Sequence, residues 1–143
     1  KSLTKEIYNK STMDFTLKTT MKATAKQIYK SWLSTQRHTK MTGGVAFVSD
    51  KVGETFTAWD GELTGKNIEL EPYGKIVQSW RSSNFEDGET DSQIEILLSE
   101  NDGETTLTLN HTNVPESGGH YKKGWEEHYF EPMRNYFETL NRG

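Results

Sequence analysis

The fold is decided by the C-terminal stretch at residues 119–140, which reads GHYKKGWEEHYFEPMRNYFETL. Large apolar side chains recur there at four-residue steps, at Tyr121, Trp125, Tyr129, Met133 and Phe137. Steps of three and four residues place side chains on one face of an α-helix, and the lysines, glutamates and arginine of the stretch fall on the other face. This pattern predicts a long amphipathic helix with a mostly aromatic buried face, able to cover a whole sheet.

The residues before this stretch predict the sheet that it covers. Alternating apolar and polar residues indicate strands at 14–21, 53–59, 62–71, 75–81, 92–98 and 105–111, with a further apolar run at 45–48. Thr24 is expected to cap a short helix, and a second helical turn is expected between residues 34 and 42. The Asp60-Gly61 pair and the Asn101-Asp102-Gly103 turn give links of hairpin length, so we expect antiparallel pairing.

The alternation also predicts which sheet face is covered. Ile76, Gln78 and Trp80 share one face of their strand, while Ser79 and Arg81 share the other. We therefore expect an α+β fold in which a curved antiparallel sheet wraps around a long C-terminal helix, with two short helices after the first strand. The whole chain, 1–143, is predicted to form a single domain with residues 1–13 as an N-terminal extension.

Composition limits the possible functions. The 143 residues carry a formal net charge of −4, which offers no electrostatic attraction for nucleic acid. There is no cysteine, which favours an intracellular, cytoplasmic protein. No apolar run approaches the ~20 residues that a membrane span needs, and the first residues lack the apolar core of a signal peptide.

Several motifs carry a resemblance to a known family. They are IVQSWR at residues 76–81, LNHTNVP at 109–115, and Gly124-Trp125 followed by Pro132-Met133. Over about residues 14–140 the chain resembles the activator-of-heat-shock-protein-90-ATPase homologue family, a branch of the START-like helix-grip superfamily. In the eukaryotic activator this domain follows a separate N-terminal domain with its own chaperone-contacting motif, and no such motif occurs in these 143 residues.

The resemblance implies an apolar pocket between the long helix and the sheet. The side chains expected to line it are Phe47, Phe56, Trp80, Phe85, His111, Trp125, Tyr129 and Met133. The competing interpretation is that these aromatic side chains simply fill the core, which is the commoner role for regularly spaced aromatics. Within the helix, Pro132 is expected to cause a kink, and Gly124 is expected to allow close packing against the sheet.

No pattern for catalysis or for a cofactor stands out. The histidines do not have the spacing of metal ligands; they are His38, His111, His120 and His128. The sequence contains no cysteine nucleophile, serine elbow or phosphate-binding loop, and the paired carboxylates Glu69 and Glu71 are expected at the surface. We therefore expect no catalytic residues, no metal and no cofactor.

Three functional hypotheses remain. The first is a non-catalytic module that binds a small hydrophobic or amphipathic ligand under the C-terminal helix, which requires a cavity above ~300 Å³. The second is a protein-interaction domain, in the extreme a co-factor of a chaperone such as heat-shock protein 90. The third is an enzyme of the superfamily's cyclase or hydrolase kind, with His111 as the base, which requires this side chain to face a wet cavity.

Overall fold

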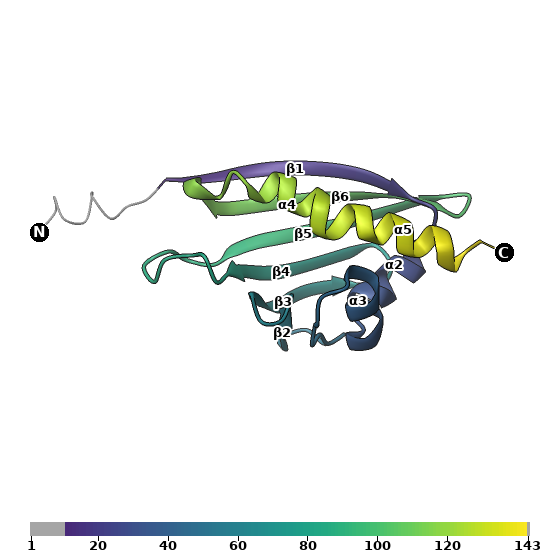
Figure 1. Cartoon of the computed structure of the whole chain (residues 1–143), viewed down its shortest axis with the longest axis horizontal. Coiled ribbons are helices and arrows are strands. Elements are labelled where there is room, and N and C mark those ends of the chain that lie inside the picture. The colour runs from purple at the N-terminus through teal and green to yellow at the C-terminus, as the bar shows by residue number, and fades with distance from the viewer. Residues whose placement is uncertain (1–10, 143) are drawn as a thin grey trace, which may run out of the picture.

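A sheet of six antiparallel strands forms the body of the molecule in the computed structural model, which describes residues 11–142 (Figure 1). The strands follow the spatial order β1-β6-β5-β4-β3-β2, so only the connection from β1 to β2 crosses the sheet. Their bounds are β1 Thr12–Met21, β2 Thr55–Ala58, β3 Leu63–Glu71, β4 Lys75–Ser82, β5 Ser92–Asn101 and β6 Glu104–Pro115. The predicted antiparallel pairing is confirmed.

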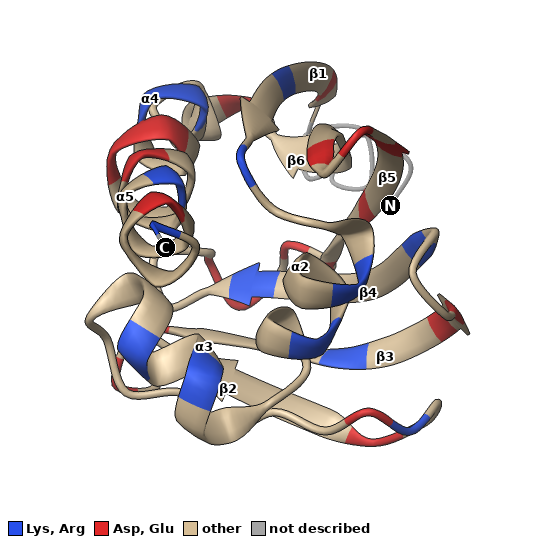
Figure 2. Ribbon diagram, turned by 90° about the vertical axis from the view of Figure 1, so that its right-hand side faces the viewer, with Lys and Arg blue, Asp and Glu red and all other residues tan. Residues whose placement is uncertain are grey.

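The helices cover the concave face of this sheet. Figure 2 shows the sheet curving around the C-terminal helical stretch, with α3 lying against α5. The helical bounds are α2 Ala25–Trp32, α3 Thr35–Thr42, the 3-10 turn η1 Glu116–Gly118, α4 Tyr121–Trp125, the π-helical segment η2 Glu126–Phe130 and α5 Glu131–Leu140. The predicted architecture of a curved sheet around a long C-terminal helix, with two short helices after the first strand, is confirmed.

The core lies between the sheet and the last helix. Ile76 and Ile94 from the sheet and Met133 and Phe137 from α5 have no exposed surface. Along β4, Ile76, Gln78 and Trp80 are all buried, as the alternation predicts, whereas Ser79 on the other face is partly exposed. Burial that is mainly on one face, with Val77 on the other face of β4 as a buried exception, explains why the period-two pattern is readable in the sequence.

Local signals determine the bounds of the two short helices. The Thr24 hydroxyl accepts a hydrogen bond from the Gln27 backbone N–H at 3.0 Å, and the Gln27 side chain accepts one from the Thr24 backbone N–H at 2.9 Å. This reciprocal capping box starts α2, as expected of Thr24. At the start of α3 the Ser34 hydroxyl accepts a hydrogen bond from the Arg37 backbone N–H at 3.3 Å, and Gly43 ends the helix with a φ of 89°, a conformation that glycine adopts without strain.

A buried chain of hydrogen bonds ties the loop before β2 to the sheet. The Trp32 indole N–H donates to Gln78 Oε1 at 3.1 Å, and the Gln78 amide donates to Asn67 Oδ1 at 2.8 Å. The Asn67 amide in turn donates to the carbonyls of Ser49 and Lys51, at 2.8 and 3.0 Å. The side-chain amides of Gln78 and Asn67 are thus both paired within this hydrogen-bond network. Their burial in the core is therefore stabilising rather than costly.

Three features differ from the sequence-based expectation. The run at 45–48 forms no strand; only Phe47 makes an isolated bridge to Thr57. Strand β6 continues to Pro115 instead of ending at residue 111. Residues 1–10 of the predicted N-terminal extension lie outside the described residues, and Thr12 and Met13 already belong to β1.

The C-terminal helix departs from α-helical geometry before Pro132 rather than at it. Residues of η2 form a π-helical turn in which the Glu131 N–H bonds to the Glu126 carbonyl, five residues back. Pro132 lies in the first turn of α5, where its missing N–H costs little. The kink predicted at Pro132 stays a prediction; what the structure has is a π-helical turn just before that residue.

Candidate functional site

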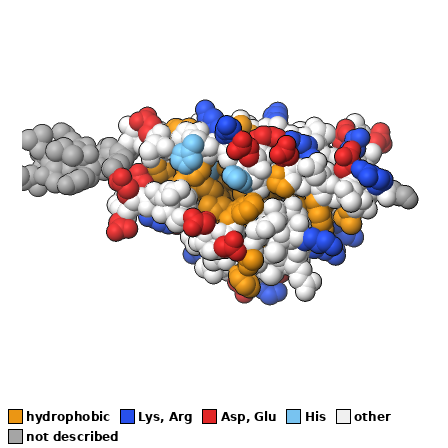
Figure 3. Space-filling model, viewed as in Figure 1, with side chains coloured by type: hydrophobic (Ala, Val, Ile, Leu, Met, Phe, Trp, Pro, Cys, Tyr) orange, Lys and Arg blue, Asp and Glu red, His pale blue; other side chains and the backbone are white. Residues whose placement is uncertain are grey.

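A cleft of about 560 Å³ lies between the first half of the C-terminal helical stretch and the adjacent ends of strands β3 and β4. Its apolar lining consists of Trp59, Leu63, Trp80, Tyr121, Trp125 and Tyr129. Its polar lining consists of Glu62, Ser82, Asn84, His120, Lys123, Glu127 and His128. Figure 3 shows a hollow in which apolar side chains are visible next to two histidine side chains. The volume exceeds the ~300 Å³ at which pockets for small molecules begin.

The helical stretch supplies the upper wall of this cleft. Tyr121, Trp125 and Tyr129 project into it from consecutive turns, and Gly124 lies between them in the lining. A Cβ atom at Gly124 would meet only the His128 ring, at an ordinary distance of 4.0 Å. The expectation that Gly124 allows close packing against the sheet is therefore wrong. Its missing side chain instead leaves open space in the cleft.

A buried chain of hydrogen bonds holds the wall in place. The Trp125 indole N–H donates to His111 Nδ1 at 3.0 Å. Nδ1 is therefore unprotonated, and the proton of the neutral ring lies on Nε2, which bonds to Ser92 Oγ at 2.9 Å. The Ser92 hydroxyl donates onward to the Trp80 carbonyl at 2.8 Å. His111 thus links two of the tryptophans in the lining from behind.

Burial keeps this histidine neutral. His111 has no exposed surface, and burial lowers its pKa from 6.5 to about 3. Both ring nitrogens are occupied and neither faces the cleft, so His111 does not meet the condition that a catalytic base would require. Burial also lowers the pKa of His38, against the opposing effect of its hydrogen bond to the Trp32 carbonyl. The Nε2 atom of His38 is buried without a hydrogen-bond partner.

Trp59 enters the cleft from a strained turn between β2 and β3. Trp59, Asp60 and Gly61 have positive φ values of 52°, 58° and 89°, a rare conformation for a bulky residue. The Trp59 ring packs over Gly44, where a Cβ atom would come within 2.3 Å of it. It also meets Tyr129 edge-on, at 6.4 Å between ring centroids. Trp59 therefore lies outside β2, although the alternation predicts a strand that continues to residue 59.

Two buried polar groups of the cleft lining, the Trp59 indole N–H and the Tyr129 hydroxyl, lie near each other. Burial raises the pKa of the Tyr129 hydroxyl, and the nearby Trp59 N–H acts in the opposite direction with a smaller effect. The two groups do not reach hydrogen-bond geometry, and Trp59 Nε1 is buried without a partner. The Tyr129 hydroxyl is consequently a neutral group at physiological pH.

Three of the eight residues predicted to line a pocket are brought together in the cleft: Trp80, Trp125 and Tyr129. Phe85 packs behind the cleft, with its ring 6.1 Å from those of both Trp80 and Tyr121. Its contacts support the wall without lining it.

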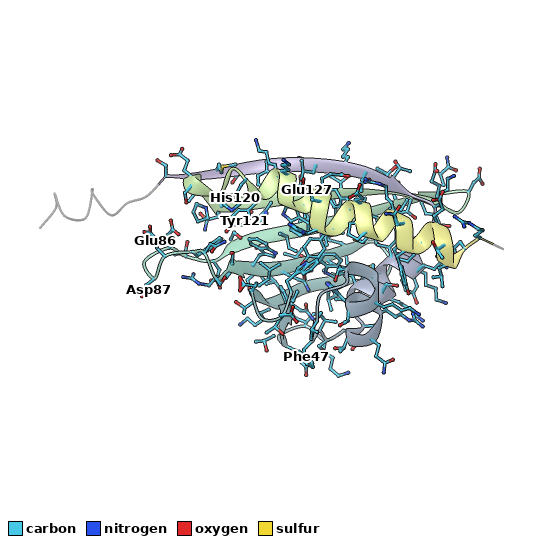
Figure 4. All side chains as sticks on the ribbon, viewed as in Figure 1. Phe47, Glu86, Asp87, His120, Tyr121 and Glu127 are labelled. Carbon is cyan, nitrogen blue, oxygen red and sulfur yellow. The ribbon has the colours of Figure 1, made fainter. Side chains whose placement is uncertain are left out.

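The other four predicted residues lie elsewhere. Met133 and His111 are fully buried in the core, and Phe56 is buried beneath Gly65 at the edge of the sheet. Phe47 is 64% exposed, on the side of the molecule away from the long helix (Figure 4). The interpretation of these aromatic positions as core packing is therefore the right one for Met133 and Phe56.

Sequence reasoning missed several lining residues. Tyr121 belongs to the four-residue stripe, and extending the expected pocket by one helical turn would have included it. Leu63 and Glu62 follow the Asp60-Gly61 turn signal directly, but nothing in the alternation shows that this turn reaches the helix. Figure 4 shows His120, Tyr121 and Glu127 on the same helical stretch above the cleft.

Two other kinds of site were sought in the part of the chain that the structure describes. Among residues 11–142 no group of three or more histidine, aspartate or glutamate side chains is placed to hold a metal ion. No helix within the same residues has the length and apolar character that crossing a membrane requires.

Comparison with known proteins places the chain among relatives of a chaperone activator. Residues 22–138 match the model of the family described as activator of Hsp90 ATPase homolog 1-like protein. The human activator of 90 kDa heat shock protein ATPase homolog 1 is 25% identical over 127 residues, which cover 88% of this chain and 37% of the human protein. The homologue from Dictyostelium discoideum is 29% identical over 93 residues, covering 63% of this chain and 24% of its own length. The chain thus spans well under half the length of these relatives.

Solved structures show the same fold. An HSP90 activator from Plasmodium falciparum has a TM-score of 0.78 at 21% identity, covering 90% of this chain and 95% of its own. The Aha1 dimer from Colwellia psychrerythraea has a TM-score of 0.75 at 16% identity, covering 92% of this chain and 99% of its own. At these identities the likeness concerns the fold alone. The match of the family model over most of the sequence shows more: the chain belongs to the activator of Hsp90 ATPase homolog 1-like family.

Proposed function

We propose that this protein is a non-catalytic module that binds a small hydrophobic or amphipathic ligand in the cleft beside its C-terminal helix. The observation that carries the proposal is the cleft itself, about 560 Å³ in volume, with six apolar side chains in its lining and polar side chains around them. Small-molecule sites share this combination of concave apolar walls and a few polar groups that fix orientation.

The helix sequence supports the same conclusion. A helix interior normally disfavours glycine, by about 1 kcal/mol relative to alanine. Gly124 has no close neighbour that would forbid a side chain, so packing within the protein does not account for it. A ligand in the cleft does, because any side chain at this position would occupy the space next to Trp125 and Tyr129.

A substitution that fills the cleft tests the proposal. Gly124→Leu should abolish binding of the neutral fluorophore phenylnaphthylamine, whose emission rises in apolar surroundings. Its thermal stability should remain equal to or above that of the wild type, because leucine favours the helix over glycine. Asn135→Leu is the matched control: it adds the same side chain to an exposed position of α5 outside the cleft and should leave binding unchanged. The proposal is contradicted if the wild type binds neither this fluorophore nor any of the three compounds octyltrimethylammonium, octanol and octanoate.

A second candidate is a chaperone co-factor that acts on an Hsp90 ATPase in the cytoplasm. Membership of the family favours it, and so does a group of exposed apolar side chains before β2, with Val45, Phe47 and Val52 exposed by 44%, 64% and 61%. Stimulation of an Hsp90 ATPase by the purified protein would support this role. Phe47→Ser should then reduce stimulation and leave ligand binding intact, whereas Gly124→Leu should do the reverse.

A further inference from the structure

Five aromatic rings of the cleft form an open-sided box. Trp80, Trp125 and Tyr129 stand in a row, with centroids 6.0 and 4.6 Å apart and neighbouring planes tilted by only 34° and 33°. A ring at each end stands almost perpendicular to this row: Tyr121 at 83° to Trp80, and Trp59 at 90° to Tyr129. Aromatic cages that bind organic cations are likewise built from several rings set at large angles to one another.

The charged side chains of the lining add negative potential to this box. Glu62 lies on the turn that carries Trp59, and Glu127 lies on the helix opposite. The one ammonium group of the described lining, that of Lys123, lies 3.8 Å from the Glu127 carboxylate. The Glu62 carboxylate accepts a hydrogen bond from the Ser83 hydroxyl at 2.7 Å and forms no ion pair with a lysine or arginine of the part of the chain that the structure describes.

The same end of the molecule carries a further acidic group. Asp87 extends from the β4–β5 loop, at the end of the molecule where the helical stretch begins (Figure 4). Charges near the entrance of a cleft raise the local concentration of ligands of opposite sign. An anionic ligand would meet this acidic surround and the negative faces of the rings together.

We propose, resting on the ligand-binding role above, that the ligand of the cleft is an organic cation: an amine or quaternary ammonium group joined to an apolar body. The cationic group lies among the aromatic faces, attracted by their electron-rich π-systems, with the Glu62 carboxylate completing the charge balance. The apolar body covers Leu63 and the space beside Gly124.

Three probes of one chain length and different charge test this inference: octyltrimethylammonium, octanol and octanoate, each below its micellar concentration. Binding is measured by isothermal titration and by quenching of tryptophan fluorescence. The cation should bind about tenfold more tightly than the alcohol, and the carboxylate least tightly.

Two variants separate charge from shape. Glu62→Gln should weaken binding of octyltrimethylammonium about fivefold and leave octanol unchanged, because only the cation loses an attraction. Tyr121→Leu keeps an apolar side chain without a π-system and should likewise reduce the preference for the cation over the alcohol. Glu104→Gln, in β6 and outside the cleft, is the control and should leave all three affinities unchanged.

The outcomes distinguish this inference from the proposed function. Equal affinity for all three probes, or tightest binding of octanoate, overturns the choice of a cation and leaves the ligand-binding role standing. Loss of octanol and cation binding to the same extent in Glu62→Gln also overturns it. If none of the three octyl probes binds the wild type, the inference fails; the ligand-binding role fails with it when phenylnaphthylamine does not bind either.

Discussion

Acidification should destabilise this protein through His111. Burial lowers the pKa of His111 to about 3 in the folded protein, against 6.5 as the ordinary value expected in the unfolded chain. Below pH 6.5 the unfolded chain therefore takes up a proton that the folded protein does not, so the free energy of unfolding falls as the pH falls. The loss continues until the pH reaches the folded pKa of about 3, and above pH 6.5 the group contributes no dependence.

The hydrogen bonds around the ring oppose protonation in addition to burial. Protonating His111 places a hydrogen on Nδ1, which already accepts the Trp125 N–H at 3.0 Å, so two donors would face each other in the core. Full linkage of one such group changes the free energy of unfolding by about 1.4 kcal/mol per pH unit, or about 2 kcal/mol between about pH 6.5 and pH 5. This is a large share of the ~5–15 kcal/mol that stabilise a typical domain.

Urea unfolding, followed by tryptophan fluorescence, measures this loss in the free energy of unfolding. The wild type and His111→Gln are unfolded at pH 7 and pH 5, and the loss between the two pH values is compared within each protein, so that any constant destabilisation by the substitution cancels. The wild type should lose about 2 kcal/mol more than the variant. His38→Gln, which removes the other buried histidine with a lowered pKa, should remove a separate share of the loss. Equal losses in the wild type and His111→Gln would refute the assignment.

Three further substitutions test the packing around the cleft and the sheet. Gly65→Ala should lower the free energy of unfolding by about 1–3 kcal/mol in urea, because its Cβ would lie 2.0 Å from the Ser79 carbonyl; unchanged stability would show that β3 can shift. Gly44→Ala should displace the Trp59 ring, because the added Cβ would overlap it, and should therefore lower thermal stability and weaken phenylnaphthylamine binding together. Normal binding would contradict the role of that ring as a wall of the cleft. Gln78→Leu should cost about 1–3 kcal/mol in thermal unfolding by leaving its indole and amide partners unpaired, and a neutral effect would mean that these groups find water.

Much of the fold is predictable from the sequence because most strands bury mainly one of their two faces. Each strand with a covered face alternates, so the bounds and inward residues of β4, including Gln78, follow from period two. The polar Gln78 on that face already points to a buried hydrogen-bond partner, but the partner itself, Trp32, lies 46 residues away and no local rule identifies it. The segment around Phe47 misleads because Val45 and Phe47 are exposed on a loop, whereas Ala46 between them is buried without belonging to a strand.

The site is less predictable because it depends on an unusual turn at Trp59 and on the missing side chain of Gly124. Trp59 reaches the cleft only because three successive residues adopt positive φ, and strand alternation does not describe such a turn. Gly124 contributes by having no side chain, and a glycine in a helix has the same appearance in a sequence whether it allows close packing or leaves room for a ligand. Only the tertiary distances separate these two cases.

The π-helical turn explains how one helix both fills the core and forms a wall of the cleft. In a regular α-helix, four residues turn through about 400°, so a stripe with four-residue spacing drifts by about 40° per step and by about 80° from Trp125 to Met133. A π turn accommodates one extra residue, so those eight residues rotate like seven and the net drift falls to about −20°. Trp125 consequently faces the cleft and the sheet while Met133 still points into the core, and η2 lies at the boundary between the two. Because the eight residues that contain the π turn rotate like seven, deleting one residue from η2 should restore a continuous α-helix and leave both the aromatic wall and the core face of α5 directed as they are now.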